Sequence, residues 1–194
     1  MKHFLGLLIV SIIAFTSCDG RKTQGQALSD SIEKFKKTVN FETNVYIPKN
    51  YMEHEVDTIM SNGYRVKIKT YSDMSNAVLF SKIKDTIKYQ TYYRNFKFDI
   101  SVTKNDKEIY NESFDKQKVN IDFKYTDNLV AGSHLYNFDK LAVLKSIQVN
   151  DDPTYINMVL IDIVHAIPET DKYAFHTLYI KENGKSNIVQ VDVN

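Results

Sequence analysis

Cys18 is the residue whose chemistry is best defined by its surroundings in this sequence. It is the only cysteine among 194 residues, so no disulfide can form within the chain. It follows a basic N-terminus, an apolar run over residues 4–14 and the small residues Thr16 and Ser17. This order of segments is typical of a secretory signal peptide. We therefore expect residues 1–17 to be removed, with Cys18 as the new N-terminus.

The residues at this junction, Phe15-Thr16-Ser17-Cys18, resemble the lipobox of bacterial lipoproteins. The family pattern usually has Leu where Phe15 stands, and boxes that end in Ser-Cys are similar to those of small envelope lipoproteins from Bacteroidetes. The resemblance implies that the Cys18 thiol carries a diacylglycerol and that its freed amine carries a further acyl chain. Two acyl chains anchor a protein stably to a membrane. The alternative is an ordinary secreted protein with an incidental cysteine.

The resemblance covers residues 1–20 and implies a location in the bacterial cell envelope. In lipoproteins of this type, acidic residues shortly after the cysteine resemble a signal for export to the cell surface. Here Asp19 is followed by Arg21 and Lys22, which departs from that acidic pattern. We therefore expect a lipid-anchored domain at the outer membrane that faces the periplasm.

The charge balance of the mature chain argues against a nucleic-acid partner. The whole chain has 25 basic and 24 acidic residues, and loss of Lys2 leaves 24 of each. Proteins that bind nucleic acids usually carry a clear excess of basic residues. The 13 Tyr and 11 Phe residues favour strands and supply apolar surface. We expect a core that folds without a cofactor, a metal or a disulfide.

Candidate metal ligands gather near the C-terminus but do not form a recognisable site. Imidazole and carboxylate groups both bind transition metals, and the spacing here matches no closed site. We therefore predict no metal centre and interpret the histidines as residues near strand ends beside a polar loop. The five residues are Asp162, His165, Glu169, Asp171 and His176.

The sequence singles out no catalytic residue. Ser81 and Lys84 have the spacing of a serine nucleophile with a lysine base, but that chemistry needs a helix and this segment alternates like a strand. A Gly-x-Ser-x-Gly motif is absent from the sequence. The many carboxylates leave open a pair for glycoside hydrolysis, although no particular pair stands out.

The most suggestive surface motif is an aromatic run between Tyr89 and Phe98. Aromatic rings with interleaved polar groups can stack on sugars or hold a peptide. Strand alternation places Tyr92 and Arg94 on the face opposite Tyr89 and Tyr93. We predict ligand binding by these four residues; the alternative is that they are core residues and cross-strand pairs.

The elements that would position these groups are mostly strands. Residues 18–28 are polar and are predicted to be a flexible tether, followed by a short helix that Asp30 caps with Glu33 and that presents Ile32 and Phe35 on one face. Residues 141–149 fit either a strand or a helix. Alternating or apolar runs predict strands at 41–47, 55–60, 64–71, 78–93, 96–103, 108–114, 119–125, 155–164, 173–181 and 187–193.

Many short strands joined by tight turns predict an all-β fold with antiparallel sheets. We expect one domain over residues 29–194, a β-sandwich or a barrel of about 9–10 strands, with one short N-terminal helix. We interpret the protein as a lipid-anchored, non-enzymatic envelope protein that binds a protein, peptide or glycan. An envelope hydrolase with a carboxylate or histidine site, and a structural or assembly lipoprotein, are the alternatives.

Overall fold

The computed structural model describes residues 22–38, 42–84, 87–127 and 130–191. These residues fall into two compact units. The smaller unit holds helix α2 (Gln24–Thr38) together with residues 42–43, 83–84 and 87–88, and the larger unit holds the remaining described residues. The predicted signal peptide and Cys18 lie outside the described residues.

Helix α2 begins earlier than the sequence predicted. The backbone N–H of Gln26 donates to Thr23 Oγ1 at 3.3 Å, and the Thr23 N–H donates to Gln26 Oε1 at 3.1 Å. This reciprocal pair is a capping box, and it starts the helix ahead of Asp30. Residues 24–28, which were predicted to be part of the tether, are therefore helical.

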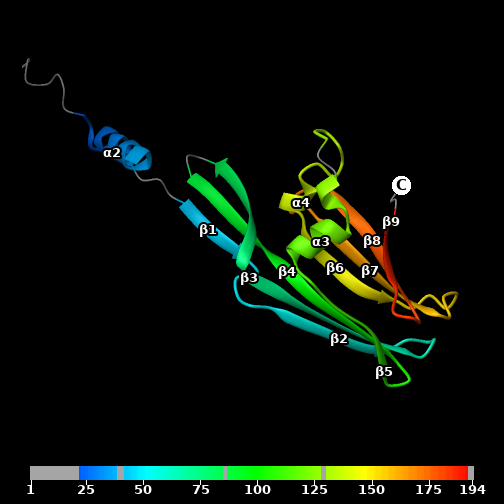
Figure 1. The fold of residues 1–194 in the computed structure, drawn as a ribbon. Coiled ribbons are helices and arrows are strands. Elements are labelled where there is room, and N and C mark those ends of the chain that lie inside the picture. The colour runs from blue at the N-terminus through cyan, green and yellow to red at the C-terminus, as the bar shows by residue number, and fades with distance from the viewer. Residues whose placement is uncertain (1–21, 39–41, 85–86, 128–129, 192–194) are drawn as a thin grey trace, which may run out of the picture. The chain divides into compact units, whose positions relative to one another are not determined.

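The larger unit confirms the predicted all-β fold and takes the sandwich form, with two sheets in which most strand pairs are antiparallel (Figure 1). In sheet A the strand order is β1-β4-β3-β2, and β5 also pairs with β4. In sheet B the order is β6-β7-β8-β9. The strands are β1 (Glu42–Ile47), β2 (Glu53–Ile59), β3 (Tyr64–Lys84), β4 (Ile87–Lys104), β5 (Lys107–Phe114), β6 (Val143–Asn150), β7 (Met158–Ala166), β8 (Tyr173–Lys181) and β9 (Ser186–Val191).

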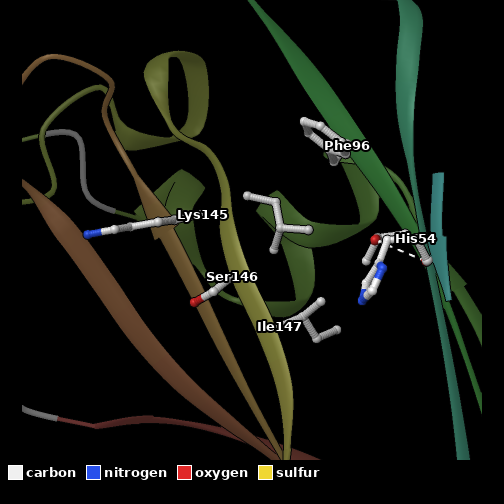
Figure 2. Close-up of a pocket in the computed structure, with 7 residues that line it drawn as sticks. His54, Phe96, Lys145, Ser146 and Ile147 are labelled. Atoms are coloured by element: carbon white, nitrogen blue, oxygen red, sulfur yellow. Dashed lines mark hydrogen bonds between the residues drawn. The ribbon is translucent and has the colours of Figure 1, made fainter. Parts of the chain in front are cut away.

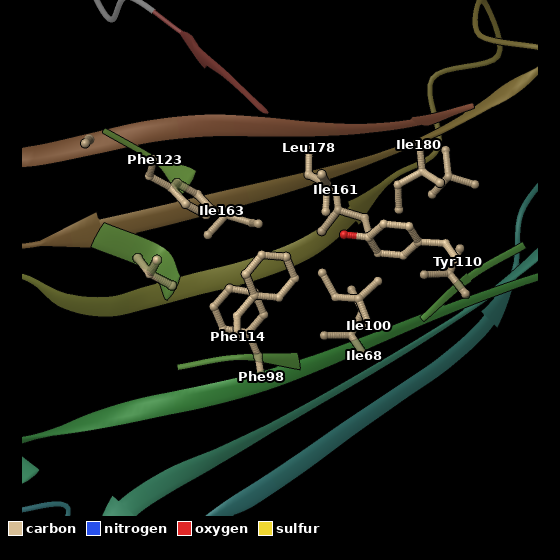
Figure 3. Close-up of a cluster of buried hydrophobic side chains, with 14 of the residues drawn as sticks. Ile68, Phe98, Ile100, Tyr110, Phe114, Phe123, Ile161, Ile163, Leu178 and Ile180 are labelled. Carbon is tan, nitrogen blue, oxygen red and sulfur yellow. The ribbon is translucent and has the colours of Figure 1, made fainter. Parts of the chain in front are cut away.

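The core lies between the two sheets, where side chains from each point toward the other (Figure 3). Phe98 and Ile100 of β4 are fully buried, as are Ile161 of β7 and Ile180 of β8. The Phe98 ring stacks on Phe114 of β5 with centroids 4.8 Å apart. Burial of this apolar surface, at about 25 cal/mol per Å², is the main force that holds the sheets together.

The predicted strand at 119–125 is wrong, because this segment forms helix α3 (Lys116–Asp122) and a 3₁₀ turn at Tyr125–Asp127. Asp115 caps α3: its Oδ1 accepts the Lys118 N–H at 2.9 Å. Val119 and Phe123 are four residues apart and both buried, whereas Ile121 between them is 60% exposed. The alternating pattern in the sequence also fits a helix that buries every fourth residue.

The predicted strand at 78–93 is also wrong in its limits. It covers the end of β3 and the start of β4, and residues 85–86 between them lie outside the described residues. The sequence has no Gly or Pro between residues 83 and 88, and both strands alternate, so the sequence shows no break. The ambiguous segment 141–149 is mainly strand β6, and the predicted buried strand is the central strand β7.

Two glycine turns hold the hairpins. Gly63 follows Asn62 between β2 and β3 with φ +82°, as the Asn-Gly pair predicted. Gly184 lies between β8 and β9 with φ +78°, and a Cβ added there would lie 2.4 Å from the carbonyl oxygen of Ile109 in β5. The β8–β9 turn of sheet B therefore contacts the backbone of sheet A at a point that only glycine permits.

Sheet A is longer than sheet B. Strands β3 and β4 have 21 and 18 residues, whereas the longest strands of sheet B have 9. We call residues 64–71 of β3 and 98–104 of β4 the core half, since their inward side chains lie in the core. We call residues 44–47 of β1, 72–82 of β3 and 89–95 of β4, all within the larger unit, the extension.

Candidate functional site

The predicted aromatic residues lie on the extension. On one face of it two tyrosine rings and an arginine side chain are stacked. Tyr92 of β4 stacks on Tyr46 of β1 with ring centroids 4.7 Å apart and planes at 15°. The Arg94 guanidinium lies over the Tyr46 ring, 4.6 Å from its centroid. On the same face the Tyr92 hydroxyl donates to Gln90 Oε1 at 3.3 Å. The alternation predicted for Tyr92 and Arg94 therefore places them together.

Arg94 mainly makes hydrogen bonds within the protein that link neighbouring strands. Its Nε donates to the carbonyl oxygen of Pro48 at 3.1 Å, and its Nη1 donates to the carbonyl oxygen of Met74 at 2.6 Å. These bonds tie the end of β1 and a residue of β3 to β4. A planar guanidinium can hold two such acceptors while it stacks on an aromatic ring. Much of the donor capacity of Arg94 is thus used internally.

The opposite face of the extension holds Tyr93. Its ring meets Phe80 of β3 edge to face, with centroids 5.6 Å apart, and its hydroxyl donates to Glu169 Oε1 at 3.1 Å. Lys82 forms an ion pair with the same carboxylate. Burial, followed by the hydrogen bond to Glu169, raises the pKa of Tyr93, whereas hydrogen bonds from Lys82 and Tyr93 lower the pKa of Glu169.

The four predicted binding residues therefore do not share one face, and their role in binding stays a prediction. Tyr89, 42% exposed, is the most accessible of the four. The structure adds neighbours that the sequence analysis missed, because they come from β1 and from the far end of β3. Exposed apolar side chains on or beside the extension are Val45, Tyr46, Ile47, Tyr51, Met52, Met74, Leu79 and Tyr89.

A second group of polar side chains is buried in the core. The Tyr125 hydroxyl lies 3.1 Å from His165 Nδ1 and 3.3 Å from His176 Nδ1. Burial lowers the pKa of His165 to about 3 and that of His176 to about 4, so both rings are neutral near neutral pH. Tyr125 can donate its proton to one imidazole and accept an N–H from the other. This arrangement satisfies the Tyr125 hydroxyl and both Nδ1 atoms inside the core.

Lys116 lies close to this group. Its ammonium donates to the carbonyl oxygen of Ala142 at 2.6 Å, and burial lowers its pKa to about 8. Lys116, Asn95 and His165 line a cavity of about 10 Å³. A cavity of this volume can hold little more than one water molecule, so the site as it stands is too small for an organic substrate.

A larger cavity of about 290 Å³ lies between sheet A and strand β6 (Figure 2). Ile147 points toward His54, whereas Lys145 extends away from the cavity, and the β6–β7 register shifts between Leu144 and Ser146. Its volume is at the lower limit for small-molecule sites. The lining residues are His54, Thr70, Phe96, Leu144, Lys145, Ser146 and Ile147.

A third cavity, of about 380 Å³, lies between β5, α3 and β9. Lys118 crosses it, with Nζ 3.3 Å from Glu112 Oε2 and 3.0 Å from Asp122 Oδ2. The Tyr110 hydroxyl donates to the same Glu112 oxygen at 3.2 Å. Ser186 and Ile188 of β9 complete the lining, together with Phe114, Lys124 and Asn187.

The five residues weighed as metal ligands do not converge on one point. His165 and His176 meet at Tyr125, whereas Glu169 binds Lys82 and Tyr93. Asp162 accepts hydrogen bonds from Thr177 at 2.8 Å and from Asn150 at 2.9 Å. In the part of the chain that the structure describes, no three His, Cys, Asp or Glu residues are placed to hold one metal ion.

The remaining findings concern membrane-spanning helices and similarity to known proteins. Among the described residues, no helix has the length and apolar character needed to cross a bilayer. A comparison with protein-family models finds no match for the chain, and a comparison with curated proteins finds none either.

Proposed function

We propose that this protein is a lipid-anchored, non-enzymatic binding protein of the bacterial cell envelope, and that the extension of sheet A binds a protein partner. The observation that carries the proposal is the set of exposed apolar side chains on the extension. Ile47, Leu79 and Tyr89 are 45%, 45% and 42% exposed. Exposed apolar surface that gathers in one region is typical of an interaction site.

The geometry favours a protein over a glycan. A sugar needs an open aromatic face on which to stack, but Tyr46 lies between Tyr92 and Arg94. The other exposed side chains on or beside the extension include the aliphatic Val45, Ile47 and Leu79 as well as Tyr51 and Tyr89. Aliphatic side chains on a rigid sheet suit a protein surface that buries them away from water.

Photocrosslinking from the extension tests this proposal. A photoreactive residue would replace Leu79 in the full chain, expressed in its own cells, and Glu55 on strand β2 would be replaced in a matched control. Both positions are exposed strand residues of sheet A. We expect Leu79 to give a discrete adduct with one envelope protein. Equal labelling from both positions, or none from Leu79, would contradict the proposal.

The proposed anchor rests on the lipobox-like residues before Cys18 and needs its own test. Mass spectrometry of the mature N-terminus should show an acylated Cys18 and the loss of residues 1–17. Protease added to intact cells should leave the domain uncut if it faces the periplasm, and should digest it after the outer membrane is opened. An unmodified Cys18 would refute the anchor, and digestion in intact cells would refute the orientation.

A further inference from the structure

Strand β9 is an edge of sheet B that lacks the usual protection against pairing with another strand. In the described chain β9 pairs with β8 alone, so one side of its backbone has no strand partner. Natural edge strands are commonly protected by charged side chains, proline or irregularities. The sequence of β9, Ser-Asn-Ile-Val-Gln-Val, has no charged residue and no proline, and its register with β8 is unbroken.

The other edges of the described sheets do carry such protection. Strand β2 contains Glu53 and Asp57. Strand β5 begins with Lys107, and strand β6 has Lys145 at the point where its register with β7 shifts. Strand β1 contains Glu42, and Pro48 directly follows its last residue. Among the described edge strands, β9 is the one without a charged side chain.

We propose that β9 pairs antiparallel with β9 of a second copy of this chain, which makes the two B sheets continuous. Ile188 is partly buried against the core, whereas Val189 and Val191 are 41% and 36% exposed. Inward and outward residues thus alternate along β9. An antiparallel register centred on Ile188 sets inward residues against inward residues, and two uncharged strands meet there without like-charge repulsion.

The cavity beside β9 supports a second copy as the occupant. In this register Gln190 of the second copy lies opposite Ser186, which lines the cavity between β9, β5 and α3. That cavity is polar on the α3 side, where Lys118 bridges Glu112 and Asp122. The uncharged amide of Gln190 can both donate and accept hydrogen bonds. It therefore suits a lining that presents both signs of charge.

Co-expression of two differently tagged full chains tests the pairing. Retrieval of one tag should recover the other copy, and Val189→Lys should abolish the recovery because it adds a charge to the exposed seam. Gln148→Lys is the matched control, since it places the same charge on β6 at the opposite edge of sheet B. It should leave recovery unchanged. No recovery in the wild type, recovery that survives Val189→Lys, or equal loss in both variants would overturn the proposal.

A second measurement tests the pairing of two β9 strands even if Val189→Lys impairs folding. A photoreactive residue at Val189 of an otherwise wild-type chain should give an adduct that contains two copies of this chain and no other protein. An adduct with a different protein would reject the second copy as the occupant. Leu79 would be labelled separately, so failure of the proposed partner site and failure of this pairing give different results.

Discussion

The core half and the extension of sheet A are built from the same two strands, yet they use apolar side chains differently. In the core half Phe98, Ile100 and Val102 are fully buried beneath sheet B. In the extension Leu79 and Tyr89 keep 45% and 42% of their surface exposed. Both halves alternate in sequence as strands do. The comparison shows that alternation predicts a strand, but not whether a second layer covers it.

The largest contrast should come from truncation of one aromatic side chain in each half. Phe98→Ala removes a fully buried ring that stacks on Phe114, and it should lower the free energy of unfolding by about 3–5 kcal/mol. Tyr92→Ala, in the extension, should cost about 1 kcal/mol, since its ring is only partly buried. Urea unfolding of both variants measures the difference. Equal losses would show that the extension is part of the core.

Acid should destabilise the protein through the core half. His165 and His176 have folded pKa values of about 3 and about 4, below the ordinary value of about 6.5. Between these values the unfolded chain binds more protons, so the free energy of unfolding falls as pH falls through about 6.5. Each histidine should contribute a loss of about 2 kcal/mol between about pH 7 and about pH 5.

Unfolding across a pH series measures this slope, and His176→Phe provides the comparison. With one titrating ring removed, the slope below about pH 6.5 should fall by about half. An unchanged slope in the variant would mean that other groups control the acid sensitivity.

The turn at Gly184 should be more sensitive to substitution than the turn at Gly63. Both glycines have positive φ, so alanine should cost about 1–2 kcal/mol at either position. At Gly184 the new Cβ would also lie 2.4 Å from the Ile109 carbonyl oxygen, whereas Gly63 has no atom within 4 Å of that position. Gly184→Ala should therefore lose at least about 1 kcal/mol more. Thermal unfolding of the two variants decides this, and equal losses would contradict the contact between the sheets.

The smallest effect should come from loss of the Arg94 hydrogen bonds in the extension. Arg94→Lys loses the planar fork that holds the Pro48 and Met74 carbonyl oxygens, at a cost of about 1 kcal/mol. The core half should not change, so near-ultraviolet signals from its tyrosines should persist. Proteolysis within residues 44–47, the part of β1 in the extension, should become faster. A general loss of protease resistance in the core would contradict this division of the sheet.

Much of the fold could be predicted from the sequence because short-range patterns determine it. Asn62-Gly63 specified a hairpin, and the apolar run ending at Val164 specified a central strand. The segment from Val119 to Tyr125 was misassigned because alternate apolar residues fit both a strand and a helix with one buried stripe. Its cap at Asp115 was the signal that could have distinguished them.

The candidate site could be predicted only in part. Tyr89, Tyr92, Tyr93 and Arg94 come from one strand, so the sequence shows their alternation. Their partners come from other strands: Tyr46 stacks on Tyr92 from β1, and Glu169 reaches Tyr93 from the β7–β8 loop. Such contacts depend on sheet order, which periodicity does not encode. The exposure of the extension likewise depends on the shorter length of sheet B.

The long pairing of β3 with β4 has a consequence for backbone dynamics. Amide protons exchange with solvent when their hydrogen bonds open, and opening is easiest where few buried contacts hold the strands. Exchange along both strands should therefore be fast near Leu79 and slow progressively toward Phe98, with no loop to separate the two regimes. A partner bound to the extension would slow exchange first at its fast end. Amide exchange along β3 and β4 would therefore report, residue by residue, whether a partner is bound to the extension.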